Sequence, residues 1–584
     1  MDEINTHRGA DLPVLNTLLS SWLRLIFRRA YPDVPIDPAF VSAVPTANPE
    51  FGDYQCNAAM AFGKALKKSP REVAQRVLAE VAFPESVERA EVAGPGFINL
   101  TINSEWLARH LEKLGRDERL GVPPVGAGQT VVMDYSSPNV AKPMHIGHIR
   151  STVIGNALDR LYRFLGYRVI ADNHIGDWGT QFGILIMGYR HFADAEALAR
   201  APVEELERVY VKSYERTKQD PQWLEQCRAE LVKLQAGDPE NVALWRKFVE
   251  LSLQEFERIY KRLGVSFDLV RGESYYRDRL GDVVQRLLQA GLARESEGAI
   301  VVFLDDENLP VCIVRKSDGA YNYATTDLAT VASRVEEFIP ERIIYVTDER
   351  QQTHFKQIFA ICRKLGYQVQ LEHVWFGLMR LPEGTFSTRE GNVIKLEKLL
   401  DEAEARALAI VRSTSPQMTE EQQKEVARAV GIGAVKYADL SQNPQTLVVF
   451  SWEKALAMDG NSAPYLQYAC ARIASVLDKF SERFPGRSIE AYPLRFTQPI
   501  ERTLGLKLAR FPEVVLRAAE LYRPSVLADY LYDVAQTYNT FYQNVPFLTA
   551  PEGICESRVR LCALVARILR TGLCLLGIET PDRI

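Results

Sequence analysis

Residues 136–148 read Ser136-Ser137-Pro138-Asn139-Val140-Ala141-Lys142-Pro143-Met144-His145-Ile146-Gly147-His148. The apolar run 130–135 just before them predicts a buried strand. A helix is expected from about His148 to Leu165, ended by Gly166. The stretch therefore lies between a strand and a helix N-terminus, where backbone N–H groups and the helix dipole favour phosphate.

His145 and His148 stand three residues apart at the predicted helix start. That spacing puts both rings on one face, where both can donate hydrogen bonds to one phosphoryl group. Gly147 between them is expected to leave room for an adenine against the backbone. A metal pair or a capping histidine is the alternative, but no third ligand follows at metal-site spacing. The sequence thus favours phosphate, and we expect no metal bound by the protein, zinc included.

Strand 168–172 follows the helix, so strand, helix and strand form one right-handed crossover unit of a parallel sheet. A second unit of strand, helix and strand is expected at 342–346, 351–365 and 369–375. Two units separated by a long insertion predict a split, doubly wound nucleotide-binding core. The insertion, about 190–295, is dense in Glu, Lys, Arg and Leu at helical spacing. We expect it to form helices packed on the core.

The segments on either side of the core differ in pattern. Before it, Ser69-Pro70-Arg71-Glu72 predicts a boxed helix start and a helix to about Val81. Gly94-Pro95-Gly96 predicts a turn before a half-buried strand at 97–103, so this end is a small α/β module. After residue 455, apolar residues three or four apart predict an all-α domain. The expected domains are 1–115, 116–455 and 456–584.

Composition sets wider limits. The 584 residues are 47% hydrophobic and 25% charged, which is too long a chain for one hydrophobic core. The eight cysteines form no Cys-x-x-Cys pair and are expected to be reduced and mostly buried. No signal peptide or membrane-spanning run is visible, which predicts a cytoplasmic protein. With a net charge of -5, any RNA binding must depend on local patches.

The stretch 136–148 resembles the signature of class I aminoacyl-tRNA synthetases, and specifically of the arginyl-tRNA synthetase family. The resemblance continues in Asn173-His174-Ile175-Gly176-Asp177-Trp178-Gly179-Thr180-Gln181-Phe182-Gly183 and covers nearly the whole chain except the insertion. It implies an α/β protein: a class I synthetase Rossmann-type parallel-sheet catalytic core, an N-terminal α/β module and an all-α C-terminal helical domain. It also implies that L-arginine is activated by ATP, accompanied by Mg²⁺, and transferred to tRNA(Arg) by a monomer.

The second class I signature, a Lys-Met-Ser-Lys-Ser loop, has only a degenerate counterpart, Phe386-Ser387-Thr388-Arg389-Glu390-Gly391. By resemblance, Lys142 compensates for the missing lysines by reaching the ATP phosphates, with Arg389 as a second candidate. A plain surface turn is the alternative for this loop. The resemblance assigns catalysis to His145, Gly147, His148, Lys142 and Arg389, and ATP binding to His145, Gly147, His148, Ser387 and Thr388.

Arginine recognition requires fixed carboxylates, because a guanidinium presents five donors in a planar fork that matches carboxylate oxygens two at a time. Asp134, at the end of the first core strand, and Asp327, at a predicted helix start, are the candidates. Alternatively, Asp327 or Thr325 caps that helix. By resemblance, the guanidinium is held by Asp134, Tyr323 and Asp327, and the α-amino and carboxylate end by Asn139 and Gln351.

Candidate tRNA contacts occur at both ends of the chain. The run 463–473 resembles the start of the family's anticodon-binding domain, where Tyr465, Tyr468 and Arg472 could stack on or contact splayed bases. The N-terminal module resembles the domain that contacts the tRNA D loop. There, Tyr54, Gln55 and Asn57 either read an unstacked base or hold their own loop. Five more aromatic residues are candidates, most of them expected in the core: Tyr530, Tyr532, Tyr538, Phe541 and Tyr542.

Two rival functions are less consistent with these residues. One rival is a class I synthetase of another specificity, or a related nucleotidyltransferase that adds AMP to a different acid. The carboxylates Asp134 and Asp327 argue against a hydrophobic substrate. A non-catalytic, synthetase-like RNA-binding protein would not need a phosphate motif, yet Lys142, His145 and His148 are all present. The sequence therefore favours an arginine-activating enzyme.

Overall fold

The protein divides into two compact units. The computed structural model describes residues 12–46, 48–79, 81–381, 384–385 and 395–584. One unit comprises residues 1–125, 464–574 and 579–584, and the other comprises 126–463 and 575–578. The N-terminal module and the C-terminal helices thus belong to one unit, and the nucleotide-binding core to the other.

A five-stranded parallel sheet in the order β12-β11-β5-β6-β7 forms the centre of the larger unit. β5 (Thr130–Asp134) continues through α5 (Ile146–Phe164) to β6 (Arg168–Asn173). β11 (Arg342–Asp348) continues through η4 (Glu349–Gln351) and α13 (Gln352–Lys364) to β12 (Gln370–Phe376). Both predicted crossover units are confirmed. They meet where β5 pairs with β11, the point at which strand order reverses and where such sheets bind ligands at their carboxyl ends.

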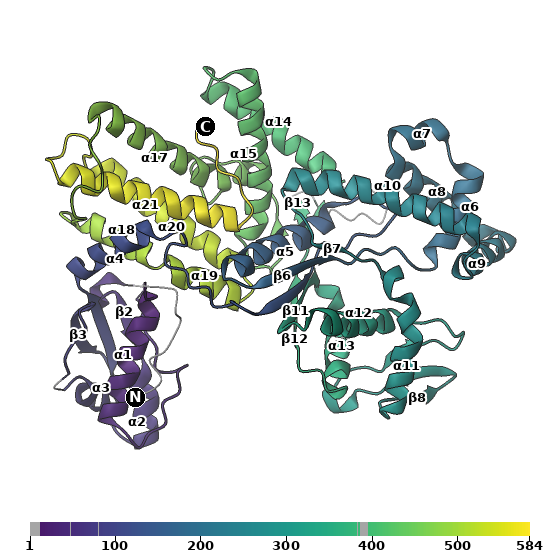
Figure 1. Ribbon diagram of the computed structural model, residues 1–584, viewed down its shortest axis with the longest axis horizontal. Helices are drawn as coiled ribbons and strands as arrows, with labels where there is room; N and C mark the ends of the chain where they lie inside the picture. Colours follow the sequence, from purple (N-terminus) through teal and green to yellow (C-terminus); the bar gives the residue numbers. More distant parts are fainter. Residues whose placement is uncertain (1–11, 47, 80, 382–383, 386–394) are drawn as a thin grey trace. The chain divides into compact units, whose positions relative to one another are not determined.

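The insertion begins with helices and ends in a mixture of short strands and helices (Figure 1). Its final part contains β7 (Leu269–Val270), η2 (Glu273–Arg279), α11 (Leu280–Gln289) and β8 (Ala293–Ser296). The prediction of helices throughout 190–295 is therefore wrong at its C-terminal end, because β7 pairs with β6 as a core strand. Two residues are too few to show a strand period. The helices before it are α6 (Gln181–Phe192), α7 (Ala195–Arg200), α8 (Pro202–Gln219), α9 (Pro221–Gln235) and α10 (Pro239–Leu263).

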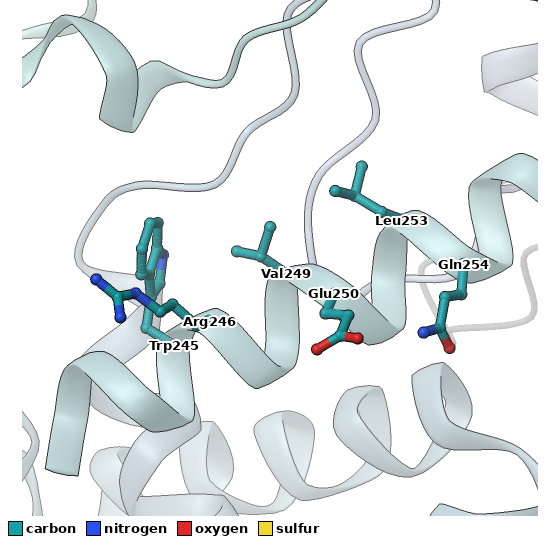
Figure 2. A pocket seen from close by; sticks show the side chains of 6 residues that line it. All are labelled: Trp245, Arg246, Val249, Glu250, Leu253 and Gln254. Atoms are coloured by element: carbon teal, nitrogen blue, oxygen red, sulfur yellow. The ribbon is translucent and has the colours of Figure 1, made fainter.

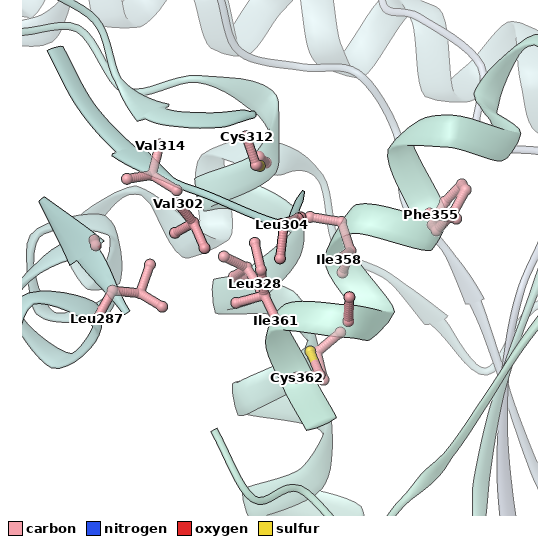
Figure 3. Close-up of a cluster of buried hydrophobic side chains, with 14 of the residues drawn as sticks. Leu287, Val302, Leu304, Cys312, Val314, Leu328, Phe355, Ile358, Ile361 and Cys362 are labelled. Atoms are coloured by element: carbon pink, nitrogen blue, oxygen red, sulfur yellow. The ribbon is translucent and has the colours of Figure 1, made fainter. Parts of the chain in front are cut away.

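A small antiparallel sheet of β8, β9 (Ala299–Val302) and β10 (Cys312–Arg315) precedes α12 (Tyr323–Phe338). One face of this sheet joins a buried cluster with α11, α12 and α13. Figure 3 shows its side chains, among them Leu287, Val302, Val314, Leu328 and Ile361. This packing brings the N-terminal ends of α12 and α13 near each other. The predicted substrate residue Tyr323 begins α12, and Gln351 immediately precedes α13.

Helices and short strands after β12 contact α5. Arg150 of α5 is 1% exposed, donates from Nε to Asp439 Oδ1 at 2.9 Å and from Nη1 to the Gly377 carbonyl at 2.6 Å. This side chain therefore joins the histidine-bearing helix to α15 (Glu420–Leu440) and to the segment before β13 (Met379–Leu381). The other elements of this part are α14 (Leu396–Thr414), α16 (Trp452–Ala455), β14 (Gly384–Thr385) and β15 (Val448–Val449).

The smaller unit combines a four-stranded sheet with two groups of helices. Strands β1 (Val44–Pro45), β2 (Tyr54–Cys56), β3 (Val87–Ala93) and β4 (Phe97–Ile102) follow the order β1-β2-β4-β3. The N-terminal helices are α1 (Leu15–Ala30), α2 (Ala58–Leu66), α3 (Pro70–Leu78) and α4 (Ser104–Arg116). The C-terminal helices are α17 (Ala463–Arg483), α18 (Pro499–Ala509), α19 (Phe511–Glu520), α20 (Pro524–Asn544) and α21 (Ile554–Leu575). An α/β module and an all-α segment are therefore both present, as predicted.

The predicted helix after Ser69 is only partly confirmed. Ser69 is the N-cap of α3 and Pro70 is its first residue, but the Ser69 side chain makes no capping hydrogen bond and the helix ends at Leu78. The predicted capping box and the end at Val81 are therefore wrong.

The cysteines are free and buried except Cys574, as expected. In the described ranges, no helix is long and apolar enough to span a membrane.

Candidate active site

The turn after β5 is built from two serines in left-handed backbone conformations, with φ of 72° at Ser136 and 48° at Ser137. The Ser136 hydroxyl lies 2.8 Å from both the Thr152 and Tyr260 hydroxyls. The Ser137 hydroxyl donates to Asp134 Oδ1 at 2.9 Å. Short polar side chains that bond locally hold such backbone conformations in place. The consecutive serines therefore turn the chain at the carboxyl end of β5.

Asn139 lies directly against Gly176. The Gly176 N–H donates to the Pro138 carbonyl at 3.1 Å, and the Val140 N–H donates to the Gly176 carbonyl at 3.0 Å. A Cβ at Gly176 would lie 2.1 Å from Asn139 Oδ1. Gly176 is thus required for the position of Asn139, and the two sequence stretches that carry the resemblance touch here.

The two signature histidines cap the helix that they begin. His145 is the N-cap of α5, and its Nδ1 accepts from the Gly147 N–H at 3.0 Å. The Nδ1 of His148 accepts from the His145 N–H at 3.1 Å, and the ring centroids lie 3.9 Å apart. Because each Nδ1 is an acceptor, a neutral ring carries its proton on Nε2. The rings therefore cap the helix and present two Nε2–H donors, so capping and phosphate binding are compatible.

The structure shows a steric role for Gly147 that differs from the predicted contact with adenine. A Cβ at this position would lie 2.8 Å from Cε1 of His145, so the glycine makes room for that ring. A contact between Gly147 and an adenine stays a prediction.

Burial keeps both imidazoles neutral. It lowers the pKa of His148 to about 3, with a smaller contribution from the neighbouring His145. Burial and the positive charges of Lys142 and Arg350 also lower the pKa of His145. Lys142 and Arg350 therefore contribute positive charge beside the ring pair, as a phosphate site requires. Arg350 was not identified from the sequence, although it immediately precedes Gln351.

Asp134 is buried and already engaged. Its Oδ2 accepts from Arg334 Nη2 at 2.7 Å, and the same guanidinium donates to Asp172 Oδ2 at 2.9 Å. Arg334 is 1% exposed and was not identified from the sequence, where it is one of many polar residues in a helical pattern. With Ser137 on Oδ1, both oxygens of Asp134 have protein donors. The predicted contact with a substrate guanidinium would therefore be shared with these donors.

Asp327 lies on the second turn of α12 and does not cap it. The N-cap is Asn322, whose Oδ1 accepts from the Tyr323 N–H at 3.0 Å, and the Thr325 hydroxyl donates to the Val314 carbonyl. The capping alternative for Asp327 and Thr325 is therefore wrong. Asp327 Oδ2 instead lies 2.5 Å from His354 Nε2 of α13.

Two other predicted arginine contacts lie at the starts of the helices that carry Asp327 and His354. Tyr323, on the first turn of α12, is 68% exposed, and Gln351 is the exposed N-cap of α13. A third group that the sequence did not reveal is Glu273 in η2. Burial, with the charges of Asp327 and Asp177, raises the pKa of Glu273 to about 8. Glu273 is therefore mostly protonated at neutral pH, and a cation bound beside it would favour its ionised form.

A hollow of about 290 Å³ lies along one side of α10 (Figure 2). Figure 2 shows Trp245, Val249 and Leu253 on the same side of the helix. The indole of Trp245 donates to the Asp177 carbonyl at 2.7 Å. A second hollow, about 780 Å³, is lined by the end of α6, α7 and α8. Neither is lined by a predicted site residue. In the described parts of the chain, no group of three or more His, Cys, Asp or Glu side chains could hold a metal ion.

The degenerate signature at 386–391, with Ser387, Thr388 and Arg389, lies outside the described residues. The first described residues after this segment lie beside the histidine motif. The backbones of Lys395 and His145 form an isolated antiparallel β-bridge, and the Leu396 N–H donates to the Met144 carbonyl at 2.9 Å. Lys395 and Leu396 therefore lie beside the predicted phosphate site.

The predicted anticodon-side residues are brought together within the smaller unit. The Arg472 guanidinium lies 4.8 Å from the Tyr468 ring centroid and 5.3 Å from that of Tyr542. Tyr465 accepts a hydrogen bond from Asn539 at 2.5 Å, and Tyr468 is 38% exposed. The three further aromatics that prove to be buried, as expected for most of them, are Tyr530, Tyr538 and Phe541.

One predicted tRNA contact is wrong. Tyr54 is fully buried, and its hydroxyl donates to Glu513 Oε1 at 2.6 Å, so it cannot meet a base. Gln55 Nε2 donates to Asn99 Oδ1 at 2.8 Å within its own sheet. Asn57 is the exposed N-cap of α2, and its contact with tRNA stays a prediction.

Known proteins share this arrangement. Residues 111–452 match the family model of the class I (R) tRNA synthetase catalytic domain, so fold and site define a class I aminoacyl-tRNA synthetase. Residues 15–102 match the arginyl-tRNA synthetase N-terminal domain, and 466–584 match the DALR anticodon binding domain. The chain belongs to the arginyl-tRNA synthetase family.

Individual relatives agree over nearly the full length. An arginine–tRNA ligase of Fusobacterium nucleatum is 45% identical over 554 residues, which cover 95% of this chain and 96% of that protein. The solved arginyl-tRNA synthetase of Plasmodium falciparum superimposes with a TM-score of 0.84, at 27% identity, over 98% of this chain and 100% of its own. The Thermus thermophilus enzyme gives 0.81 at 27% identity, over 97% and 100%.

Proposed function

We propose that this protein is an arginine–tRNA ligase whose reaction takes place around His145 and His148. It activates L-arginine with ATP and transfers it to tRNA(Arg), releasing pyrophosphate and AMP. The observation that carries the assignment to this site is the pair of neutral imidazoles at the start of α5. Both keep an Nε2–H, and they lie at the switch point between β5 and β11.

In the first step, a carboxylate oxygen of arginine attacks the α-phosphorus of ATP, which enters as its Mg²⁺ complex. The bond from that phosphorus to the bridging oxygen breaks, and pyrophosphate leaves. The Nε2–H groups of His145 and His148 and the ammonium of Lys142 stabilise the charge on phosphate oxygens. Gly147, Ser387, Thr388 and Arg389 are assigned to ATP only by resemblance.

Arginine is held at its two ends. The guanidinium binds Asp327 and Tyr323, with Asp134 as a shared contact, and Asn139 and Gln351 bind the α-amino and carboxylate end. The Asp327 carboxylate supports this orientation, and a guanidinium beside it would favour the ionised form of Glu273. Since no enzyme group becomes covalently attached, positioning accounts for much of the rate.

In the second step, a terminal ribose hydroxyl of tRNA attacks the activated carbonyl, and AMP leaves. We assign tRNA contacts to Tyr465, Tyr468 and Arg472 on α17 and to Asn57 in the N-terminal module. We expect the protein to act as a monomer in the cytoplasm. By resemblance to the family, tRNA is expected to bind before arginine is activated.

The test is exchange of labelled pyrophosphate into ATP, with each of the twenty amino acids, in the presence and absence of tRNA. Exchange with arginine alone, and only when tRNA is added, supports the proposal. Exchange with another amino acid would contradict the assignment of Asp327. No exchange by the folded protein would favour the non-catalytic RNA-binding alternative.

A further inference from the structure

His354 contacts the carboxylate to which the proposed function assigns the substrate guanidinium. It lies on the first turn of α13, three residues after Gln351, and its Nε2 is 2.5 Å from Asp327 Oδ2 of α12. We propose that His354 is a positioning residue for arginine recognition, which fixes the orientation of the Asp327 carboxylate. The proposal rests on the proposed function, since it gives His354 a role only if Asp327 binds arginine.

The direction of the hydrogen bond follows from the chemistry of the partners. A carboxylate only accepts hydrogen bonds, so Nε2 of His354 carries the proton and donates it. Within the described chain, no other group donates a hydrogen bond to Asp327. The side chains are 27% exposed at His354 and 21% exposed at Asp327, so the pair lies at the wall of an accessible site. One oxygen of Asp327 is thus occupied, and Oδ1 remains available to a ligand.

The imidazole is itself held by its surroundings. The Phe355 ring lies 5.4 Å from the ring of His354 at 73° and 4.6 Å from that of His373. His373 is anchored in turn, with Nε2 2.7 Å from the Thr347 hydroxyl of β11. Burial and the charge of His354 lower the pKa of His373 to about 4, so His373 is neutral. Packed aromatic rings therefore support the donor that orients Asp327.

Orientation matters more for a guanidinium than for other cations. Its donors are fixed in a plane, and a carboxylate must lie close to that plane to accept them. Without the His354 donor, the Asp327 carboxylate can rotate about its Cβ–Cγ bond, and arginine must fix that rotation when it binds. The loss should therefore appear in arginine binding rather than in the chemical step.

The two variants that separate donation from packing are His354→Leu and His354→Gln. Leu fills much of the space without a donor, whereas Gln places an N–H near the position of Nε2. Aminoacylation is measured with varied arginine at saturating ATP and tRNA. We expect His354→Leu to raise the arginine KM about tenfold, the effect of losing one hydrogen bond to a charged group, with kcat and the ATP KM changed by less than about twofold. His354→Gln should restore the arginine KM to within about threefold of the wild type.

Asp327→Asn, alone and combined with His354→Leu, distinguishes the two levels of the proposal. If Asp327→Asn leaves the arginine KM unchanged, the proposed arginine site is wrong. If it raises the KM but His354→Leu does not, the site stands and the role of His354 is wrong. The role of His354 is also wrong if His354→Leu changes kcat and all KM values together, or if His354→Gln does not restore the arginine KM. We expect the double variant to bind arginine no worse than Asp327→Asn, because His354 acts through Asp327.

Discussion

At the residue scale, the backbone decides what the signature histidines can donate. Both Nδ1 atoms of His145 and His148 accept main-chain N–H groups at the start of α5. Burial lowers the pKa of both rings, so they remain neutral donors at physiological pH. Their Nε2–H groups can then stabilise developing charge without a proton being transferred.

This arrangement predicts the effect of His148→Asn. The Asn side-chain oxygen can replace Nδ1 as acceptor for the His145 N–H, but nothing replaces the Nε2–H donor. We expect arginine-dependent pyrophosphate exchange to fall about 100-fold, as for removal of one oxyanion donor, with thermal stability nearly unchanged. His191→Asn is the control. In the described part of the chain, the His191 ring makes one hydrogen bond, to the Met187 carbonyl of its own helix. Wild-type exchange by His148→Asn would remove His148 from the catalytic residues.

Gly176 gives a second test at this scale. A Cβ there would lie 2.1 Å from Asn139 Oδ1, so Gly176→Ala must displace the Asn139 side chain. We expect the arginine KM to rise at least tenfold, because Asn139 is assigned to the amino-acid end of the substrate. Gly460→Ala is the matched control, since its Cβ would meet only the Ala457 Cβ, at 3.9 Å. An unchanged arginine KM in Gly176→Ala would argue against the role of Asn139.

At the element scale, buried ionic groups join segments that are distant in the sequence. Arg334 of α12 holds the ends of β5 and β6 through Asp134 and Asp172. In the smaller unit, Glu513 of α19 accepts from the Tyr54 hydroxyl of β2 and from the Asn16 N–H of α1, at 2.6 and 2.8 Å. Removal of one partner from such a group costs more than the contact itself, because a buried polar atom is left alone.

Glu513 also predicts a dependence of stability on pH. Burial raises its pKa from 4.5 to about 7, so between these values the folded state binds more protons than the unfolded state. The free energy of unfolding should therefore fall as pH rises through this window, by up to about 3 kcal/mol from this group. Glu513→Gln carries no titrating proton, so its stability relative to the wild type should increase from pH 5 to pH 8.

Urea unfolding at the two pH values measures this difference. Glu118→Gln, an exposed change in the same unit, should leave the pH dependence as it is. If Glu513→Gln and the wild type lose stability in parallel, the proton uptake does not reside at Glu513.

At the scale of the whole molecule, the two compact units separate the proposed chemistry from the proposed anticodon contacts. His145, Asp327 and His354 belong to the larger unit, whereas Tyr468 and Arg472 of α17 belong to the smaller one. A change in the smaller unit can therefore weaken tRNA binding while the arginine and ATP contacts stay intact.

Tyr468→Ala tests this separation. Tyr468 is 38% exposed beneath the Arg472 guanidinium, a combination suited to stacking on a base. We expect the tRNA KM to rise about tenfold, the effect of losing one stacked base, with arginine and ATP KM unchanged. Tyr214→Ala changes a similarly exposed tyrosine, 43%, in the other unit and should have no such effect. An unchanged tRNA KM in Tyr468→Ala would exclude Tyr468 from the tRNA interface.

The sequence by itself determined the two crossover units and the histidines at the start of α5. These follow from apolar periodicity, from glycine and from residue spacing, which act over a few positions along the chain. The burial of Tyr538 and Phe541 could also be predicted, because an aromatic stripe at helical spacing normally faces a core.

Only the tertiary structure decided which polar groups meet. Asp134 bonds to Arg334, 200 residues away, and the buried Tyr54 bonds to Glu513, 459 residues away. His354 likewise bonds to Asp327 of another helix. The tertiary structure also made Leu269–Val270 a core strand. Local sequence patterns cannot specify such partners, because a buried polar or charged group is satisfied by whatever donor the packing of distant elements brings within hydrogen-bond distance.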